Sequence, residues 1–174
     1  MKEFKTYILE KLKISVRNTT KHTLFPETKK ELLKMIEFEI SENGNECSLN
    51  HIDVSEITDM SYLFRYSTFN GDISSWDVSN VTDMSNMFSH SKFNGDISDW
   101  DVSSVTDMNE MFRESDFNRD ISKWDVSNVK DMRYMFYYSK FNGDISDWDV
   151  SKVKYIAFMF GYSPLENNPP KWYK

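Results

Sequence analysis

Cysteine is nearly absent from the sequence, because Cys47 is the only one among 174 residues. The chain can therefore form no internal disulfide and no cysteine-based metal cluster. Long apolar runs are missing as well: the N-terminal M-K-E-F-K-T-Y-I-L-E-K-L-K interleaves charges and lacks the run of about 7 to 15 apolar residues of a secretory signal. No stretch has the length of a transmembrane helix. We expect a cytoplasmic protein without membrane insertion, or a cell-surface protein if a leader has been removed.

The usual signatures of an enzyme are also missing. The phosphate-binding pattern G-x-x-x-x-G-K does not occur, and His22, His51 and His90 are scattered along the chain. Serine recurs at one position of every repeat, which is typical of a scaffold residue rather than of a unique nucleophile. Because function has to be argued from a specific site, we expect no enzyme, no catalytic residue and no bound cofactor.

Acidic residues outnumber basic ones, and the excess lies in one part of the chain. The net charge is -7, but residues 1–34 hold nine Lys/Arg against four Asp/Glu, whereas the remainder holds 12 against 24. An acidic surface repels phosphate groups, so nucleic acid and anionic lipid are disfavoured as partners. We expect a protein partner.

A period of 24 residues organises most of the chain. Tryptophan recurs at Trp76, Trp100, Trp124, Trp148 and Trp172, and phenylalanine at Phe69, Phe93, Phe117 and Phe141, with Leu165 in the fifth place. Such a period is typical of repeat proteins in which each unit buries its apolar face by stacking on its neighbours. The sequence predicts five coils, starting at Ile52, Trp76, Trp100, Trp124 and Trp148.

Two segments of each coil indicate secondary structure. The segment D-I-S-x-W is short, β-branched at its centre and bounded by turn residues, which is typical of a strand. In V-T-D-M-x-x-M-F, as at Met84, Met87 and Phe88, the apolar residues share one helical face, which indicates a short helical turn. We therefore predict an α/β solenoid with a narrow parallel sheet and short helical turns.

Residues 1–46 precede the repeat and are predicted to form an N-terminal helical cap on its first coil. Apolar spacing predicts an amphipathic helix over residues 4–12 and a second helix over residues 26–40. A separate basic binding element is the alternative for this region.

The array covers residues 47–174 and ends in a proline-rich segment. Proline removes backbone donors, which blunts the last edge and argues against end-to-end growth. We expect a monomer. The prolines of this segment are Pro164, Pro169 and Pro170.

Glycine follows asparagine in N-G-D at Gly71, Gly95 and Gly143, a turn signal in which glycine accepts positive φ without steric cost. Arg119 takes this place in the third coil. We expect the turn there to be strained or to change shape.

Aspartate forms three ladders at the repeat period. Stacked carboxylates could bind Ca²⁺, but each Asp stands beside Ser, Asn or Thr in a turn, where it can accept hydrogen bonds from its own backbone. We favour this local role and expect no metal. The ladders are Asp53, Asp77, Asp101, Asp125 and Asp149; Asp59, Asp83, Asp107 and Asp131; and Asp72, Asp96, Asp120 and Asp144.

The repeated string W-D-V-S-N-V-T-D-M-x-x-M-F-x-x-S-x-F-N-G-D-I-S resembles the bacterial BspA-like, DUF285-type leucine-rich repeat family over residues 52–172. The resemblance implies a right-handed leucine-rich-repeat solenoid used for binding, often as an adhesin-like protein on cell surfaces. It implies no catalytic residues. A phage-borne or mobile-element-borne intracellular relative is a further hypothesis.

Positions that differ between repeats are the candidate binding positions, because scaffold positions stay the same. Tyrosine and arginine are frequent there, and both are enriched in binding hot spots. The alternative is that the tyrosines only pack along a ridge. The candidates are Arg65, Tyr66, His90, Arg113, Arg133, Tyr134, Tyr137, Tyr138 and Tyr162. A competing face consists of the residues before each Trp: Ser75, Asp99, Lys123, Asp147 and Lys171.

These observations predict a non-enzymatic protein–protein interaction module. The alternative is a surface adhesin, or a structural component of a bacterium or of a phage virion, that associates through the ends of its array.

Overall fold

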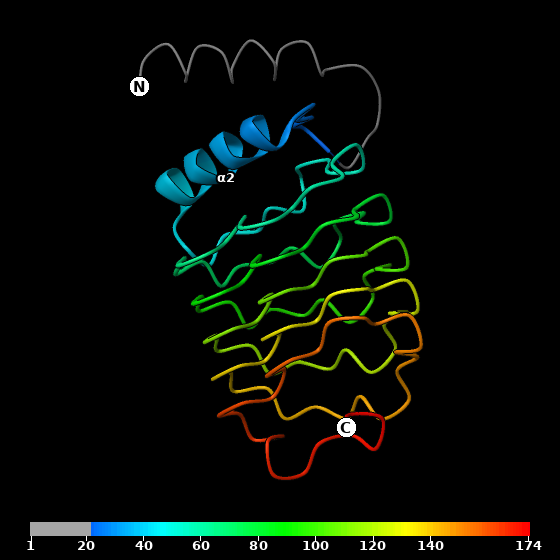
Figure 1. Ribbon diagram of the computed structural model, residues 1–174. Coiled ribbons are helices and arrows are strands. Elements are labelled where there is room, and N and C mark those ends of the chain that lie inside the picture. The colour runs from blue at the N-terminus through cyan, green and yellow to red at the C-terminus, as the bar shows by residue number, and fades with distance from the viewer. Residues whose placement is uncertain (1–21) are drawn as a thin grey trace.

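The computed structural model describes residues 22–174, so the helix predicted over residues 4–12 lies outside the described chain. The described chain begins with one α-helix, α2 (Lys29–Asn43), followed by a stack of similar coils (Figure 1). Helix α2 lies across the first coil, and the C-terminus lies at the opposite end of the stack (Figure 1).

Helix α2 is positioned by its capping residues. The Thr28 hydroxyl accepts a hydrogen bond from the Glu31 amide at 3.2 Å, and the Glu31 carboxylate accepts one from the Glu27 amide at 2.9 Å. These two bonds stabilise the helix start, and Gly44, with φ of 85°, ends the helix. The helix predicted over residues 26–40 is confirmed, displaced by about one turn because Thr28 forms the cap. Its buried residues are Leu32, Met35 and Ile36.

The predicted α/β solenoid with a parallel sheet and short helical turns is wrong. Among the described residues α2 is the only helix, and no β-strand occurs. The coils are joined by isolated parallel bridges, such as Asp83 with Asp107 and Asp107 with Asp131. Tight turns and extended single residues therefore build the coils.

The expected strand D-I-S-x-W is a turn because its polar residues bond locally. The Trp100 amide donates to the Ile97 carbonyl at 3.2 Å, which closes a four-residue turn. The Asp96 carboxylate accepts from the Ser98 amide at 3.0 Å. Asp and Ser satisfy backbone donors in this way, and their turn preference overrides the strand preference of one β-branched residue.

The expected helical turn is a series of tight turns. Met87, Ser89 and Ser91 each donate to the carbonyl three residues earlier, at 3.1 to 3.2 Å. Asn86 and His90, both with φ of 57°, interrupt the series. A right-handed helix cannot contain residues with positive φ. The apolar spacing therefore predicts one buried face correctly, but the predicted helical turn is wrong.

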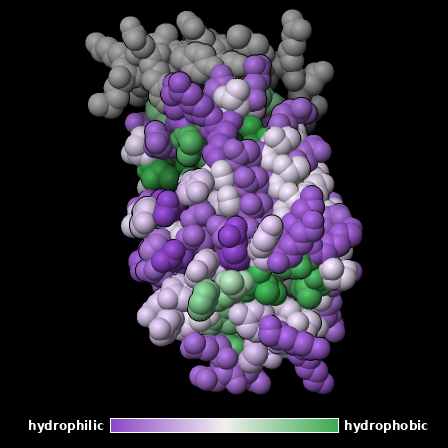
Figure 2. All heavy atoms as spheres, in the orientation of Figure 1, coloured by the Kyte–Doolittle hydropathy of each residue, from purple (hydrophilic) through white to green (hydrophobic). Residues whose placement is uncertain are grey.

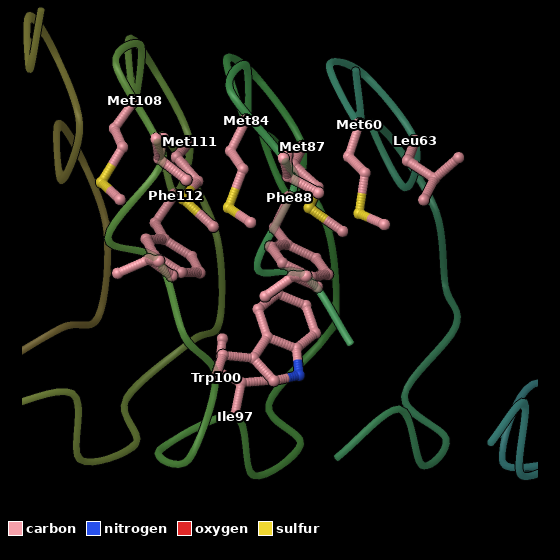
Figure 3. Packing of buried hydrophobic residues seen from close by; sticks show 14 of the residues in the cluster. Met60, Leu63, Met84, Met87, Phe88, Ile97, Trp100, Met108, Met111 and Phe112 are labelled. Atoms are coloured by element: carbon pink, nitrogen blue, oxygen red, sulfur yellow. The ribbon is translucent and has the colours of Figure 1, made fainter. Parts of the chain in front are cut away.

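The core consists of columns of identical residues stacked coil on coil. Met84, Met87 and Phe88 point inward beside their counterparts of the next coil (Figure 3). The Phe88 and Phe112 rings are parallel, with centroids 5.6 Å apart. Each tryptophan of the repeat donates its indole N–H to a buried carbonyl 27 residues earlier, as Trp100 does to Ile73 at 3.2 Å. The core is therefore continuous along the stack.

The glycines of N-G-D serve close packing rather than positive φ. Among the described glycines only Gly44 has positive φ. A Cβ added at Gly95 would lie 2.8 Å from the Phe93 ring, so glycine leaves room for this ring. Arg119 also lacks positive φ, and its Nε donates to the Asn94 carbonyl at 2.7 Å. The expected strain at Arg119 is absent.

Candidate functional site

Three columns of varying residues cover the side of the stack where the tight turns lie, and we call them together the turn-side face. The middle column contains Arg65, Ser89, Arg113, Tyr137 and Gly161. The first flank contains Tyr62, Asn86, Glu110, Tyr134 and Phe158, and the second flank contains Tyr66, His90, Glu114, Tyr138 and Tyr162. Every predicted site residue except Arg133 belongs to these columns.

Both flanks adopt the left-handed backbone conformation. Their φ angles lie between 51° and 62°, although no flank residue is glycine. The conformation lets a flank amide reach the next coil: the Tyr66 amide donates to the Ser89 carbonyl at 3.0 Å, while the Ser67 amide turns back to the Phe64 carbonyl at 3.1 Å. A left-handed residue that is not glycine costs about 1 to 2 kcal/mol. The bonds between coils impose this cost on the flanks.

At the first coil, an arginine lies between two tyrosines. The Arg65 guanidinium carbon is 5.3 Å from the Tyr62 ring centroid and 4.9 Å from the Tyr66 centroid. Tyr62 and Tyr66 are 51% and 65% exposed. Cation–π attraction holds the three side chains in one surface cluster.

The centre of the turn-side face is polar, and its side chains pair with one another. His90 Nδ1 lies 3.2 Å from Glu114 Oε2, and Arg113 Nη1 donates to Glu110 Oε2 at 2.9 Å. The His90 ring also stacks on Tyr66 with centroids 4.6 Å apart. Because these side chains pair with one another, the centre offers few groups for an outside partner.

Aromatic rings return in the last two coils. Tyr138 stacks on Tyr162 with centroids 4.3 Å apart, and Tyr134 stacks on Phe158 at 5.5 Å. Tyr137 meets Tyr138 and Tyr162 edge-on, at interplanar angles of 75° and 87°. Tyr138, Phe158 and Tyr162 are 51%, 61% and 61% exposed. We call Tyr134, Tyr137, Tyr138, Phe158 and Tyr162 the tyrosine cluster. It is the largest exposed aromatic group of the turn-side face.

Arg133 lies outside the three columns. Its Nε donates to Asp131 Oδ1 and Oδ2 at 3.0 Å each, and its guanidinium carbon lies 5.1 Å from the Tyr155 ring centroid. The structure therefore places it on the neighbouring aspartate ladder. Tyr155, 54% exposed, was missed as a site residue. The signal was present, because Tyr155 replaces the aspartate of the four earlier repeats.

The aspartate ladders are engaged in local turns. Each ladder member accepts a hydrogen bond from the amide two residues later, as Asp53 does from Ser55 at 3.1 Å and Asp107 from Asn109 at 2.9 Å. This is the geometry of the local role that the sequence favours. Within residues 22–174, no three His, Cys, Asp or Glu side chains form a group suited to a metal ion. The absence of bound Ca²⁺ stays a prediction.

The competing face before each Trp is also exposed. Ser75, Asp99, Lys123, Asp147 and Lys171 all lie on the surface. They alternate in charge and contain no aromatic residue. The view in Figure 2 shows a largely hydrophilic surface on which apolar residues gather in small separate patches.

No helix in the described part of the chain is both long and apolar enough to cross a bilayer.

Comparisons with known proteins identify a family and no individual relative. No curated protein matches the chain, and no solved structure matches it. A family model does match, over residues 31–138 and again over residues 92–172, and it is described as a Mycoplasma protein of unknown function, DUF285. These two matches overlap and together span the helix α2 region and the stacked coils. The chain therefore belongs to the DUF285 family.

Proposed function

We propose that this protein is a non-enzymatic protein-binding module that contacts its partner through the turn-side face, above all through the tyrosine cluster. The finer resemblance to BspA-like repeats, a family used for binding, supports the same role. A cytoplasmic location and a monomeric state remain predictions.

The observation that supports this function best is the exposed stack of Tyr138 on Tyr162. Both residues have positive φ, at 53° and 56°. Glycine or asparagine would adopt this conformation at lower cost, and Asn86 occupies the same kind of position in the second coil. Two exposed tyrosines at strained positions are therefore costly for the fold, and such strain concentrates at functional sites.

The chemistry of the cluster suits a protein surface. Tyrosine supplies a rigid apolar ring together with a hydroxyl group, and it is enriched among residues that dominate binding energies. The half-buried Tyr137 supports the rings of Tyr138 and Tyr162 from the side. The cluster thus has an ordered shape before any partner binds, which lowers the entropy cost of association.

The test is affinity purification from the native cell with the full chain and with a Tyr138→Ala, Tyr162→Ala variant. Both side chains are at least half exposed, so the melting temperature should change by less than about 3 °C. Tyr137 is left intact because it is half-buried and would confound binding with stability. The matched control is Lys123→Ala with Asp147→Ala on the competing face.

A partner captured by the parent and by the control, but lost by the tyrosine variant, supports the proposal. A partner lost only by the control would place binding on the competing face. Loss of folding in the tyrosine variant would assign Tyr138 and Tyr162 to the frame of the coil.

A further inference from the structure

Two arginines of the middle column occupy the same place in the first and the third coil. At Arg113, in the third coil, both flank residues are acidic: Nη1 donates to Glu110 Oε2 at 2.9 Å, and Nε lies 3.5 Å from Glu114 Oε1. At Arg65, in the first coil, both flank residues are tyrosines. The third coil therefore supplies its arginine with carboxylates, and the first coil supplies its arginine with aromatic rings.

The backbone has the same conformation at both places, so the difference lies in the side chains. The flank residues have φ of 62° and 59° in the first coil and of 54° and 51° in the third. The Tyr66 amide donates to the Ser89 carbonyl at 3.0 Å, and the Glu114 amide donates to the Tyr137 carbonyl at 2.8 Å. Arg113 thus shows which groups an arginine at this position binds when acceptors are within reach.

Arg65 has no carboxylate partner. Among residues 22–174, no Asp or Glu forms an ion pair with it. Its Nε is buried without a hydrogen-bond partner, and its Nη2 lies 3.5 Å from the Tyr66 hydroxyl, which is long for a hydrogen bond. Ser89, the next member of the middle column, is fully buried, and its Oγ makes no hydrogen bond. The charge of Arg65 is therefore unpaired in the described part of the chain.

The neighbouring lysine, by contrast, already has an acidic partner. Lys29 Nζ, from α2, lies 6.0 Å from the Tyr62 ring centroid and donates to Asp59 Oδ1 at 2.8 Å. It also donates to Ser61 Oγ at 2.6 Å. Asp59 thus pairs with Lys29 rather than with Arg65.

The guanidinium of Arg65 is held in place before any partner binds. Its carbon lies 5.3 Å from the Tyr62 centroid and 4.9 Å from the Tyr66 centroid, and the arginine is half-buried between these exposed rings. Cation–π attraction stabilises the charge but provides no oxygen acceptor for the terminal N–H groups. A carboxylate provides two such oxygens, and arginine binds them with two parallel hydrogen bonds.

The acidic character of the array makes such a contact selective. Residues 35–174 hold 12 Lys/Arg against 24 Asp/Glu, so most of this surface repels a carboxylate. An unpaired arginine is the exception. Charge repulsion elsewhere on the surface fixes where an acidic side chain of a partner can lie.

We propose that Arg65 binds the carboxylate of an Asp or Glu side chain of the protein partner. Nη1 and Nη2 of Arg65 donate to the two carboxylate oxygens, and the rings of Tyr62 and Tyr66 contact the aliphatic part of the bound side chain. This inference rests on the proposed function, because it names the chemistry of the partner at a second place on the turn-side face.

The experiment uses the full chain labelled with ¹⁵N and the peptide Ser-Val-Glu-Val-Ser with both ends blocked. The first control is the same peptide with Gln in place of Glu, which keeps the shape and removes the charge. The second is inorganic phosphate at the same ionic strength. We expect the Glu peptide at millimolar concentration to shift the Arg65 Nε resonance and the amides of Tyr62 and Tyr66, and neither control to match it.

One substitution copies the third coil into the first. In Tyr62→Glu the new carboxylate stands in the place of Glu110 and should occupy Arg65, which weakens peptide binding at least about tenfold. The matched control is Tyr62→Gln, which also loses the ring but adds no charge, and its binding should stay within about threefold of the parent. Tyr62 is 51% exposed, so both melting temperatures should stay within about 3 °C of the parent.

A second substitution tests the arginine itself. Arg65→Lys keeps the positive charge but cannot donate two parallel hydrogen bonds, so it should weaken binding of the Glu peptide about threefold or more. If Tyr62→Glu does not fold, unchanged binding by Arg65→Lys would still overturn the inference.

Other results would overturn it as well. These are no shift with millimolar Glu peptide, equal shifts with the Glu and Gln peptides, a response to phosphate at lower concentration than to the Glu peptide, shifts centred on Arg113, or unchanged binding by a folded Tyr62→Glu variant. The purification experiment changes Tyr138 and Tyr162 and leaves Arg65 and its two tyrosines intact. A partner lost there while the Glu peptide fails to bind would reject this inference and retain the proposed function.

Discussion

Gly161 and Tyr137 occupy one space: a Cβ added at Gly161 would lie 2.9 Å from both Cδ2 and Cε2 of the Tyr137 ring. A Cβ atom essentially never lies this close to a ring carbon. The Tyr137 ring can therefore lie here only because residue 161 has no side chain. The edge-on contacts of Tyr137 with Tyr138 and Tyr162 depend on that placement. A glycine thus shapes the tyrosine cluster.

The first prediction follows from this pair. Gly161→Ala should destabilise the protein by about 1 kcal/mol, because the added methyl group overpacks the Tyr137 ring. In a Tyr137→Ala background the same substitution should cost little. A double-mutant cycle in urea measures the difference, and equal costs in both backgrounds would show that the two residues do not interact.

The second prediction concerns backbone strain on the second flank. His90→Gly and His90→Ala remove the same ring, but only glycine relieves the left-handed conformation, in which φ is 57°. We expect the glycine variant to be more stable by about 1 kcal/mol. Ser89 lacks positive φ and is the matched control. There Ser89→Ala should be more stable than Ser89→Gly. The same order at both positions would contradict the assigned conformation at His90.

The third prediction concerns acid sensitivity. Hydrogen bonding by Lys140, followed by that of Lys92, holds the pKa of Asp116 below its ordinary value despite partial burial. A depressed folded pKa contributes stability above the unfolded value of about 3.9, and this stability is lost as the pH falls through the folded pKa. Asp116→Asn should therefore reduce the fall in melting temperature below about pH 4. The same fall in melting temperature in the parent and in the variant would contradict this assignment.

Asp107 should behave in the opposite sense. Burial, and then the neighbouring carboxylates Asp131 and Asp83, raise its pKa, although a hydrogen bond from Asn109 opposes the shift. A raised folded pKa favours the protonated form, so the stability it contributes is lost as the pH rises through the folded pKa. Asp107→Asn should gain in melting temperature relative to the parent between about pH 4 and 7. A gain that appears only in acid would exclude repulsion along the aspartate ladder.

The repeat period and the identity of the core residues could be predicted from the sequence, because stacking places identical residues on one another. Whether each coil contains strands could not. A single Ile in D-I-S-x-W suits strand and turn alike, and hydrogen bonds from the neighbouring Asp decide between them. The left-handed residues were equally hidden, because Tyr, Phe and Glu do not favour this conformation. Amides bonding to the next coil impose it, and such contacts have no local signal.

The candidate site was predicted in its position along the chain but not in its shape. Variation after M-F identified Tyr66, Tyr138 and Tyr162, which the structure places on one flank. Arg133 varies for a different reason, since it pairs with Asp131.

The central claim is that the partner binds the turn-side face, and site-specific photo-crosslinking in the native cell tests it most directly. A benzophenone-bearing phenylalanine at Tyr138, which is 51% exposed, is compared with the same residue at Lys123 on the competing face. We predict a discrete covalent adduct with one protein from position 138 and none from position 123. An adduct from position 123 alone, or no adduct from either position, would contradict the claim.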